Sequence, residues 1–129
     1  MSDRKMASKR LSKVRLELAR EPDHPAGDQT YGYVMVAPLH EDGKIDAARW
    51  REDRERCRIV RFRPNGEEEI GHLVHQPGGQ WAFHYDVEGT DKDEPGFRLG
   101  NEIFARGQYI SIKSKDGMHT YRVTSVEPV

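Results

Sequence analysis

Three glycine-containing turn sequences constrain the fold of this chain more than any other feature. They are Pro64-Asn65-Gly66, Pro77-Gly78-Gly79 and Asp116-Gly117. Each lies between short runs rich in β-branched and aromatic residues, which is the pattern of two antiparallel strands joined by a tight turn. The second half of the chain is therefore predicted to consist of β-hairpins.

The first half adds further strands and one helix. Val14, Leu16 and Leu18 alternate with charged residues, whereas the run at 30–39 has apolar residues at both parities. That second run predicts a strand covered on both faces, or one that changes face at Gly32. A helix is expected at about 46–54, because Asp46 can cap it and because Ile45 and Trp50 have the spacing of a hydrophobic staple.

The chain of 129 residues is the length of one domain. Residues 1–12 are small, polar and basic, and predict a disordered arm. Residues 13–129 predict a single all-β domain, either a strongly bent antiparallel sheet or a small β-barrel, with about seven strands and one short helix.

The turn types predict which residues face each other across the hairpins. A three-residue loop at 64–66 pairs Val60 with Ile70, Arg61 with Glu69 and Arg63 with Glu67. A two-residue loop at 78–79 pairs Gln76 with Trp81, Val74 with Phe83 and His72 with Tyr85 on the apolar face. A two-residue loop at 116–117 pairs Ser114 with His119, Ile112 with Tyr121 and Ile110 with Val123, which leaves His119 to bond Ser114 or a backbone group.

The charge balance argues against binding to nucleic acids or membrane surfaces over the whole molecule. The 21 Lys and Arg residues nearly cancel the 22 Asp and Glu residues, so the formal net charge is -1. No run of about 18 apolar residues is present to span a membrane. The single cysteine, Cys57, excludes an intramolecular disulfide, and a cytoplasmic location is expected.

The histidines of the second hairpin raise the hypothesis of a metal site. His84 is predicted on the face opposite to Trp81, Phe83 and Tyr85, diagonal to His75 and close to Asp86. Imidazole and carboxylate groups are ligands that zinc accepts. However, His75 and Asp86 would lie roughly 13 Å apart along the sheet, so paired surface side chains are the favoured interpretation and no cofactor is expected.

No catalytic motif stands out in the sequence. Cys57 lies between Arg56 and Arg58, which would lower the pKa of a thiol close to them, but a single strand cysteine is more often part of a core. An enzyme or metal-binding barrel using His75 and His84 is therefore the lesser alternative.

The expected function is a non-enzymatic binding or regulatory module for a protein or small ligand. Its candidate contacts are Phe97 and Leu99, which follow the acidic segment 87–96, and the arm residues Arg4, Lys5, Lys9 and Arg10. The alternative is a nucleic-acid-associated protein that uses the basic arm and the arginine-rich stretch 49–63. The acids interleaved in that stretch argue against this alternative, and the sequence leaves the oligomeric state open.

Overall fold

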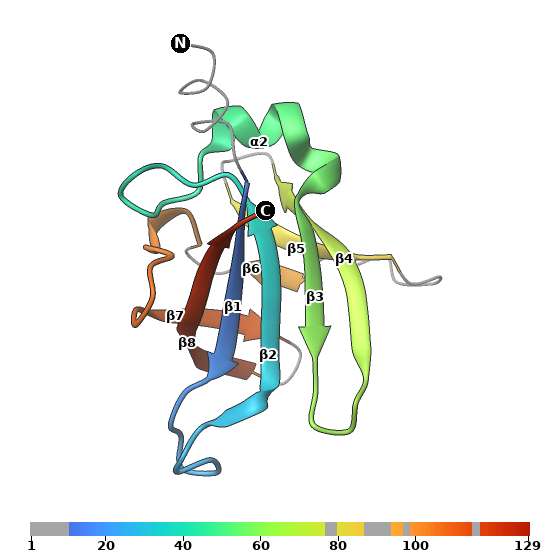
Figure 1. Ribbon diagram of the computed structural model, residues 1–129. Helices are drawn as coiled ribbons and strands as arrows, with labels where there is room; N and C mark the ends of the chain where they lie inside the picture. Colours follow the sequence, from blue (N-terminus) through green and yellow to red (C-terminus); the bar gives the residue numbers. More distant parts are fainter. Residues whose placement is uncertain (1–10, 77–79, 87–93, 97–98, 115–116) are drawn as a thin grey trace.

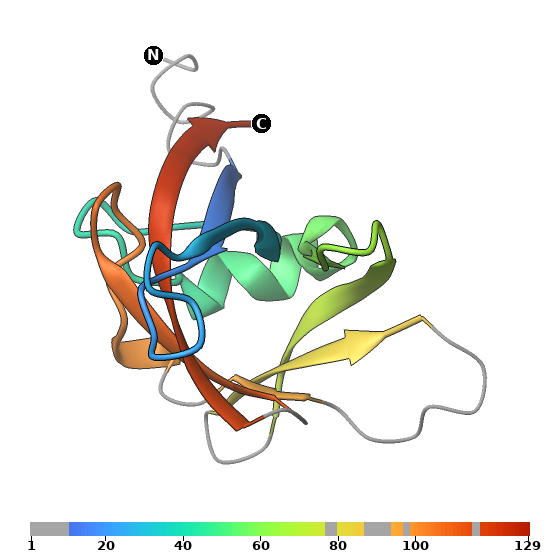
Figure 2. The same ribbon diagram turned by 90° about the horizontal axis from the view of Figure 1, so that it is seen from below.

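The computed structural model describes residues 11–76, 80–86, 94–96, 99–114 and 117–129. They form one antiparallel sheet of eight strands in the order β6-β5-β4-β3-β2-β1-β8-β7. The sheet curls strongly, and the helix α2 crosses one end of it (Figures 1 and 2). The all-β prediction is confirmed, and the short β6 accounts for a count of eight rather than about seven.

The first four strands and the helix follow the expected local patterns. The strands are β1 (Ser12–Leu18), β2 (Asp28–Ala37), β3 (Arg58–Phe62) and β4 (Glu68–His75). Helix α2 (Ala47–Asp53) is followed by the 3-10 turn η1 (Arg54–Arg56). Asp46 caps α2 by accepting a hydrogen bond from the Arg49 N–H at 3.1 Å, as predicted.

The remaining elements are the strands β5 (Trp81–Tyr85) and β6 (Glu94–Gly96), the 3-10 turn η2 (Leu99–Asn101), and the strands β7 (Tyr109–Ser114) and β8 (Gly117–Pro128). Strand β1 lies between β2 and β8, so the first strand pairs with the last one. The edge strands β6 and β7 approach each other, which brings the two ends of the curled sheet together. None of the described helices is long and apolar enough to cross a membrane.

The domain boundary lies slightly earlier than predicted. Leu11 is buried and its carbonyl accepts a hydrogen bond from the Val129 N–H at 3.0 Å, while Ser12 already belongs to β1. Of the arm predicted at 1–12, Ser12 therefore belongs to the sheet and Leu11 is buried, while residues 1–10 lie outside the described part of the chain.

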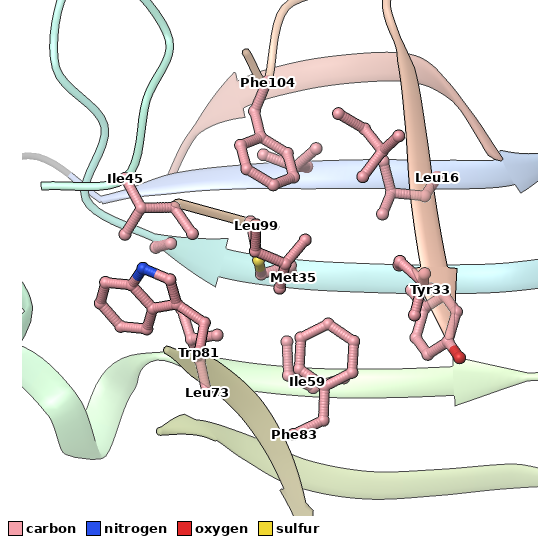
Figure 3. Packing of buried hydrophobic residues seen from close by; sticks show 14 of the residues in the cluster. Leu16, Tyr33, Met35, Ile45, Ile59, Leu73, Trp81, Phe83, Leu99 and Phe104 are labelled. Atoms are coloured by element: carbon pink, nitrogen blue, oxygen red, sulfur yellow. The ribbon is translucent and has the colours of Figure 1, made fainter. Parts of the chain in front are cut away.

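The interior of the curled sheet is packed with apolar side chains. They come from every long strand, from α2 and from the segment after η2, and Figure 3 shows ten of them, labelled, converging between the strands. On β2 the buried side chains are those of Tyr33, Met35 and Ala37, and Tyr31 packs against the same cluster, so this strand keeps one face toward the core and does not change face at Gly32. Ile45 and Trp50 are both buried in the same cluster, as the staple spacing predicts.

The three predicted registers have different outcomes. The hairpin at 64–66 is confirmed: Val60 faces Ile70, Arg61 faces Glu69, and the Arg63 N–H bonds the Glu67 carbonyl at 3.0 Å. However, Arg61 lies on the inner face with an exposed fraction of 9%, so its position opposite Glu69 is not that of an exposed ion pair.

The hairpin predicted at 78–79 is wrong by one residue. His72 faces His84, Leu73 faces Phe83 and His75 faces Trp81. Gln76 donates its N–H to the Gln80 carbonyl at 2.7 Å, so three residues separate the paired positions rather than two. In a two-residue loop, residue 77 would also have to donate an N–H to the Gln80 carbonyl, and proline has none, so the Gln76 N–H makes this bond instead.

The hairpin predicted at 116–117 is wrong by two residues. Ser114 faces Gly117, Ile112 faces His119 and Ile110 faces Tyr121. A shift of two positions preserves the side of the sheet on which each residue lies. Ile110, Ile112, Tyr121 and Val123 are therefore still buried, as expected.

Candidate functional site

The outer face of the central strands carries an unusual combination of aliphatic and basic side chains. Because Val14, Ile59 and Leu73 point inward, their neighbours at odd sequence separations point outward. Val34 and Val36 on β2 and Val60 on β3 are half-buried on this face, and Ile70 on β4 is 50% exposed. Val34 faces Val60 and Val60 faces Ile70, so an aliphatic row crosses three adjacent strands.

This face is hollowed over the strands β1, β2 and β3. The hollow, here named the outer hollow, has a volume of about 650 Å³. It is lined by Lys13, Arg15, Gln29, Thr30, Val34, Val36, Arg58, Val60, Phe62, Arg63, Pro64, Gly66, Glu67 and Glu68. Its floor is apolar, and most of its rim is charged.

Two of the cations at the outer hollow are engaged within the protein. Arg15 forms an ion pair with Glu17 at 2.7 Å, and its guanidinium lies 4.4 Å from the centre of the Phe62 ring. The guanidinium of Arg63 lies 4.0 Å from the centre of the Tyr31 ring and donates to the Phe62 carbonyl at 2.9 Å. These two arginines are held in place by their partners.

The other two cations, Lys13 and Arg58, are exposed at one end of the hollow. Within the described residues, neither forms an ion pair or a side-chain hydrogen bond. Lys13 faces Val36, and Arg58 lies on the next strand at the same level, because Met35 faces Ile59. This end of the hollow is therefore positively charged, whereas Glu67 and Glu68 line the opposite end.

The residues proposed for a metal site do not converge. His84 lies on the outer face, as predicted, but the corrected register places His75 on the opposite face of β4. The His75 ring stacks on Trp81 with 4.2 Å between ring centres and meets Trp50 edge-on at 5.8 Å. Within the described residues, no group of three His, Cys, Asp or Glu side chains has a geometry that could hold a metal ion.

Asp86 has a partner that the sequence analysis placed on the wrong face. His72 was expected beside Tyr85 on the apolar face, but it faces His84 on the outer one. Its Nδ1 atom lies 3.1 Å from Asp86 Oδ1. The one-residue register error accounts for this miss, since such an error moves every side chain of a strand to its other face.

The residues predicted to contact a partner do not form one surface within the described part of the chain. Leu99 is buried in the core with an exposed fraction of 1%, so its side chain is not available at the surface. Phe97 and the arm residues Arg4, Lys5, Lys9 and Arg10 lie outside the described residues. In the stretch 49–63, the arginines exposed to solvent are Arg51, Arg54, Arg56 and Arg58.

Cys57 is a core residue rather than a reactive thiol. Its side chain is fully buried, and its Sγ lies 3.4 Å from the Asp53 carbonyl oxygen. Burial, with a smaller contribution from the Asp53 charge, raises the pKa of Cys57 to about 12. The preferred interpretation of Cys57 as part of the core is confirmed, and Arg56 and Arg58 are exposed while the thiol is buried.

A second polar cluster joins residues that are far apart in the sequence. Glu21 Oε2 lies 2.8 Å from His119 Nδ1, and Glu21 Oε1 lies 3.6 Å from His24 Nδ1. The rings of both histidines contact Tyr31. His119 therefore pairs with a carboxylate rather than with Ser114 or a backbone group, and no local signal shows a contact across 98 positions.

Comparison of the chain with protein-family models, curated proteins and solved structures gave no match.

Proposed function

We propose that this protein is a non-enzymatic binding module that holds a macromolecular partner against the outer face of β1, β2, β3 and β4. The observation that carries the proposal is the aliphatic row on this face, half-buried or exposed, next to two cations that have no partner among the residues that the structure describes. An exposed apolar patch with a polar rim is the usual character of an interaction surface.

The interior of the sheet supports a surface site rather than an internal one. Large side chains, among them Tyr33, Phe83 and Phe104, fill the space between the strands (Figure 3). The one thiol is buried and has a raised pKa, which disfavours a nucleophilic role. These features support binding through side chains on the outside of a rigid β framework.

Site-specific photo-crosslinking in cells tests this proposal. A benzophenone amino acid replaces Ile70, and the matched control places it at Met118, an apolar residue with a similar exposed fraction, 47% against 50%. We expect a discrete adduct at position 70, identified by mass spectrometry, whose yield falls when Lys13 and Arg58 are both changed to Glu. Equal labelling at both positions, or no adduct at position 70, would contradict the proposal.

Nucleic-acid association is a second candidate because of the exposed arginines of η1. Arg54 and Arg56 lie four and two positions before Arg58 in the chain, and all three are exposed. Binding through these groups would weaken steeply with salt. Titration with a fluorescent single-stranded oligonucleotide at about 0.05 and 0.2 M salt checks this. Each phosphate contact should make the slope of log K against log salt concentration steeper by about 0.7.

A further inference from the structure

The strands under the outer hollow cannot bind a partner by adding a strand. In the sheet, β1, β2, β3 and β4 each have a paired neighbour on both sides. Their backbone N–H and C=O groups are therefore committed to the sheet, and recognition on this face has to use side chains. An element that lies across the face, rather than along an edge, fits this constraint.

The chemistry of the floor favours apolar protein side chains over nucleic-acid bases. Val34, Val36 and Val60 are aliphatic, whereas bases bind single-stranded sites mainly by stacking on aromatic rings. Phe62 is the aromatic residue that lines the hollow, and the Arg15 guanidinium lies over its ring. The floor thus suits the apolar stripe of a partner protein.

The charges at the ends of the outer hollow indicate how a bound element would be oriented. Lys13 and Arg58 lie on strands that flank β2, so their backbones are about two strand spacings apart, or roughly 10 Å. This separation is close to the diameter of an α-helix with its side chains. Glu67 and Glu68 lie at the opposite end of the hollow together with Arg63, so the excess of positive charge is at the end of Lys13 and Arg58.

We propose that the outer hollow receives an amphipathic helix of a partner protein, with an apolar stripe bordered by Asp or Glu at the end that lies between Lys13 and Arg58. This inference rests on the proposed function and narrows its partner to one class. The apolar stripe covers the aliphatic row, and the carboxylates pair with two cations that have no other partner within the described residues.

Defined helical peptides test the inference directly. The first peptide carries a leucine stripe bordered at one end by Glu, the second has the same stripe bordered by Lys, and the third has the composition of the first with the stripe scrambled. We expect the first to bind at least about tenfold more tightly than the others, as measured by fluorescence anisotropy. Its amide shift changes should map to residues 34–36, 58–60 and 70 in nuclear magnetic resonance spectra.

A charge-reversed protein provides the matched comparison. The double variant Lys13→Glu, Arg58→Glu should lose at least about tenfold in affinity for the first peptide and gain affinity for the second. The control double variant Lys113→Glu, Arg106→Glu changes two exposed cations outside the outer hollow and should bind like the unmodified protein. Circular dichroism verifies that both variants fold.

Equal affinity for the Glu-bordered and Lys-bordered peptides, or shift changes confined to another face, would overturn the inference. Binding of a single-stranded oligonucleotide at residues 34–36 and 58–60 without peptide binding would also overturn it, and would support a nucleic-acid partner. If a specific adduct forms at position 70 but contains no acidic amphipathic helix, this inference fails while the binding function stands. If no adduct forms at position 70, both the proposed binding function and this inference fail.

Discussion

Two single residues show how far local sequence predicts structure: Asp46 at the start of helix α2 and the buried cysteine Cys57. The Asp46 side chain accepts a hydrogen bond from the first turn of α2, and the spacing of Ile45, Asp46 and Trp50 makes this visible in the sequence. Cys57 shows the opposite case. Its neighbours Arg56 and Arg58 are adjacent in sequence but exposed, so the environment of the thiol is set by burial rather than by these two charges.

Replacing Asp46 by Ala should lower the free energy of unfolding by about 0.5–2 kcal/mol, because it removes the acceptor for a helix N–H. Asp46→Asn is the matched control, since it keeps a capping oxygen. Urea unfolding followed by circular dichroism measures both variants. Equal losses in the two variants would show that the charge of Asp46, rather than its capping oxygen, matters.

The buried thiol should make stability fall in alkaline solution. The pKa of Cys57 is raised from 9.0 to about 12, so burial favours the protonated form. The contribution of the protonated thiol to the free energy of unfolding is complete below pH 9. It is lost as the pH rises toward 12, because Cys57 ionises at a lower pH in the unfolded chain than in the folded one. Unfolding free energies between pH 8 and 10 should therefore decrease less in Cys57→Ala than in the unmodified protein, and iodoacetamide should react with the native thiol very slowly.

At the scale of elements, turn sequences predicted which strands form hairpins better than they predicted how those strands align. The 64–66 loop was assigned correctly because Gly66 adopts a positive φ of 86°, as its three-residue turn requires. The glycine pair at 78–79 predicted a loop one residue too short, because Pro77 has no N–H for the Gln80 carbonyl and Gln76 makes that bond instead. That one-residue error decided which histidines were thought to meet.

Close approach of two strands explains Gly71. A Cβ atom at this position would lie 2.3 Å from the His84 carbonyl oxygen and 2.9 Å from the Tyr85 Cα. Gly71→Ala should therefore cost about 1–3 kcal/mol, since the backbone of β5 has to move. Gly100→Ala is the control, because its nearest neighbour would be the Trp81 ring at 3.5 Å. Thermal unfolding compares the two, and equal stability would contradict the close approach.

The Glu21–His119 pair should attach the β1–β2 connection to β8. Both side chains are about one-fifth exposed, and the Ala19 N–H also bonds the Thr120 carbonyl at 2.9 Å. A double-mutant cycle with Glu21→Gln and His119→Gln should give a coupling energy of about 0.5–3 kcal/mol. Hydrogen exchange should become faster at residues 20–27 in either single variant. Additive effects of the two changes would mean that the contact contributes nothing.

At the scale of the whole molecule, composition and alternation predicted the fold class but not the order of strands. Local patterns identify strands and hairpins, whereas the placement of β1 between β2 and β8 depends on contacts between residues more than 100 positions apart. The outer hollow could not be predicted for the same reason. Lys13, Val36 and Arg58 form one surface only after β1, β2 and β3 have become neighbours.

Deleting residues 1–10 should change the free energy of unfolding by less than about 0.5 kcal/mol, because their sequence predicts a disordered arm and the buried core of the described residues starts at Leu11. The same truncation separates the two functional candidates. It should leave binding of the Glu-bordered peptide unchanged, whereas a nucleic-acid-associated protein would lose affinity and much of its salt dependence. Loss of peptide affinity on truncation would place part of the interface in the arm.

The pairing of β1 with β8 also has a consequence for synthesis in the cell. Ser12 lies opposite Pro128, so one side of β1 stays without a neighbour until β8 has left the ribosome. Partial chains would expose the unsatisfied N–H and C=O groups of that side, a template for pairing with other nascent polypeptides. Rapid translation through residues 117–128 would shorten this vulnerable interval.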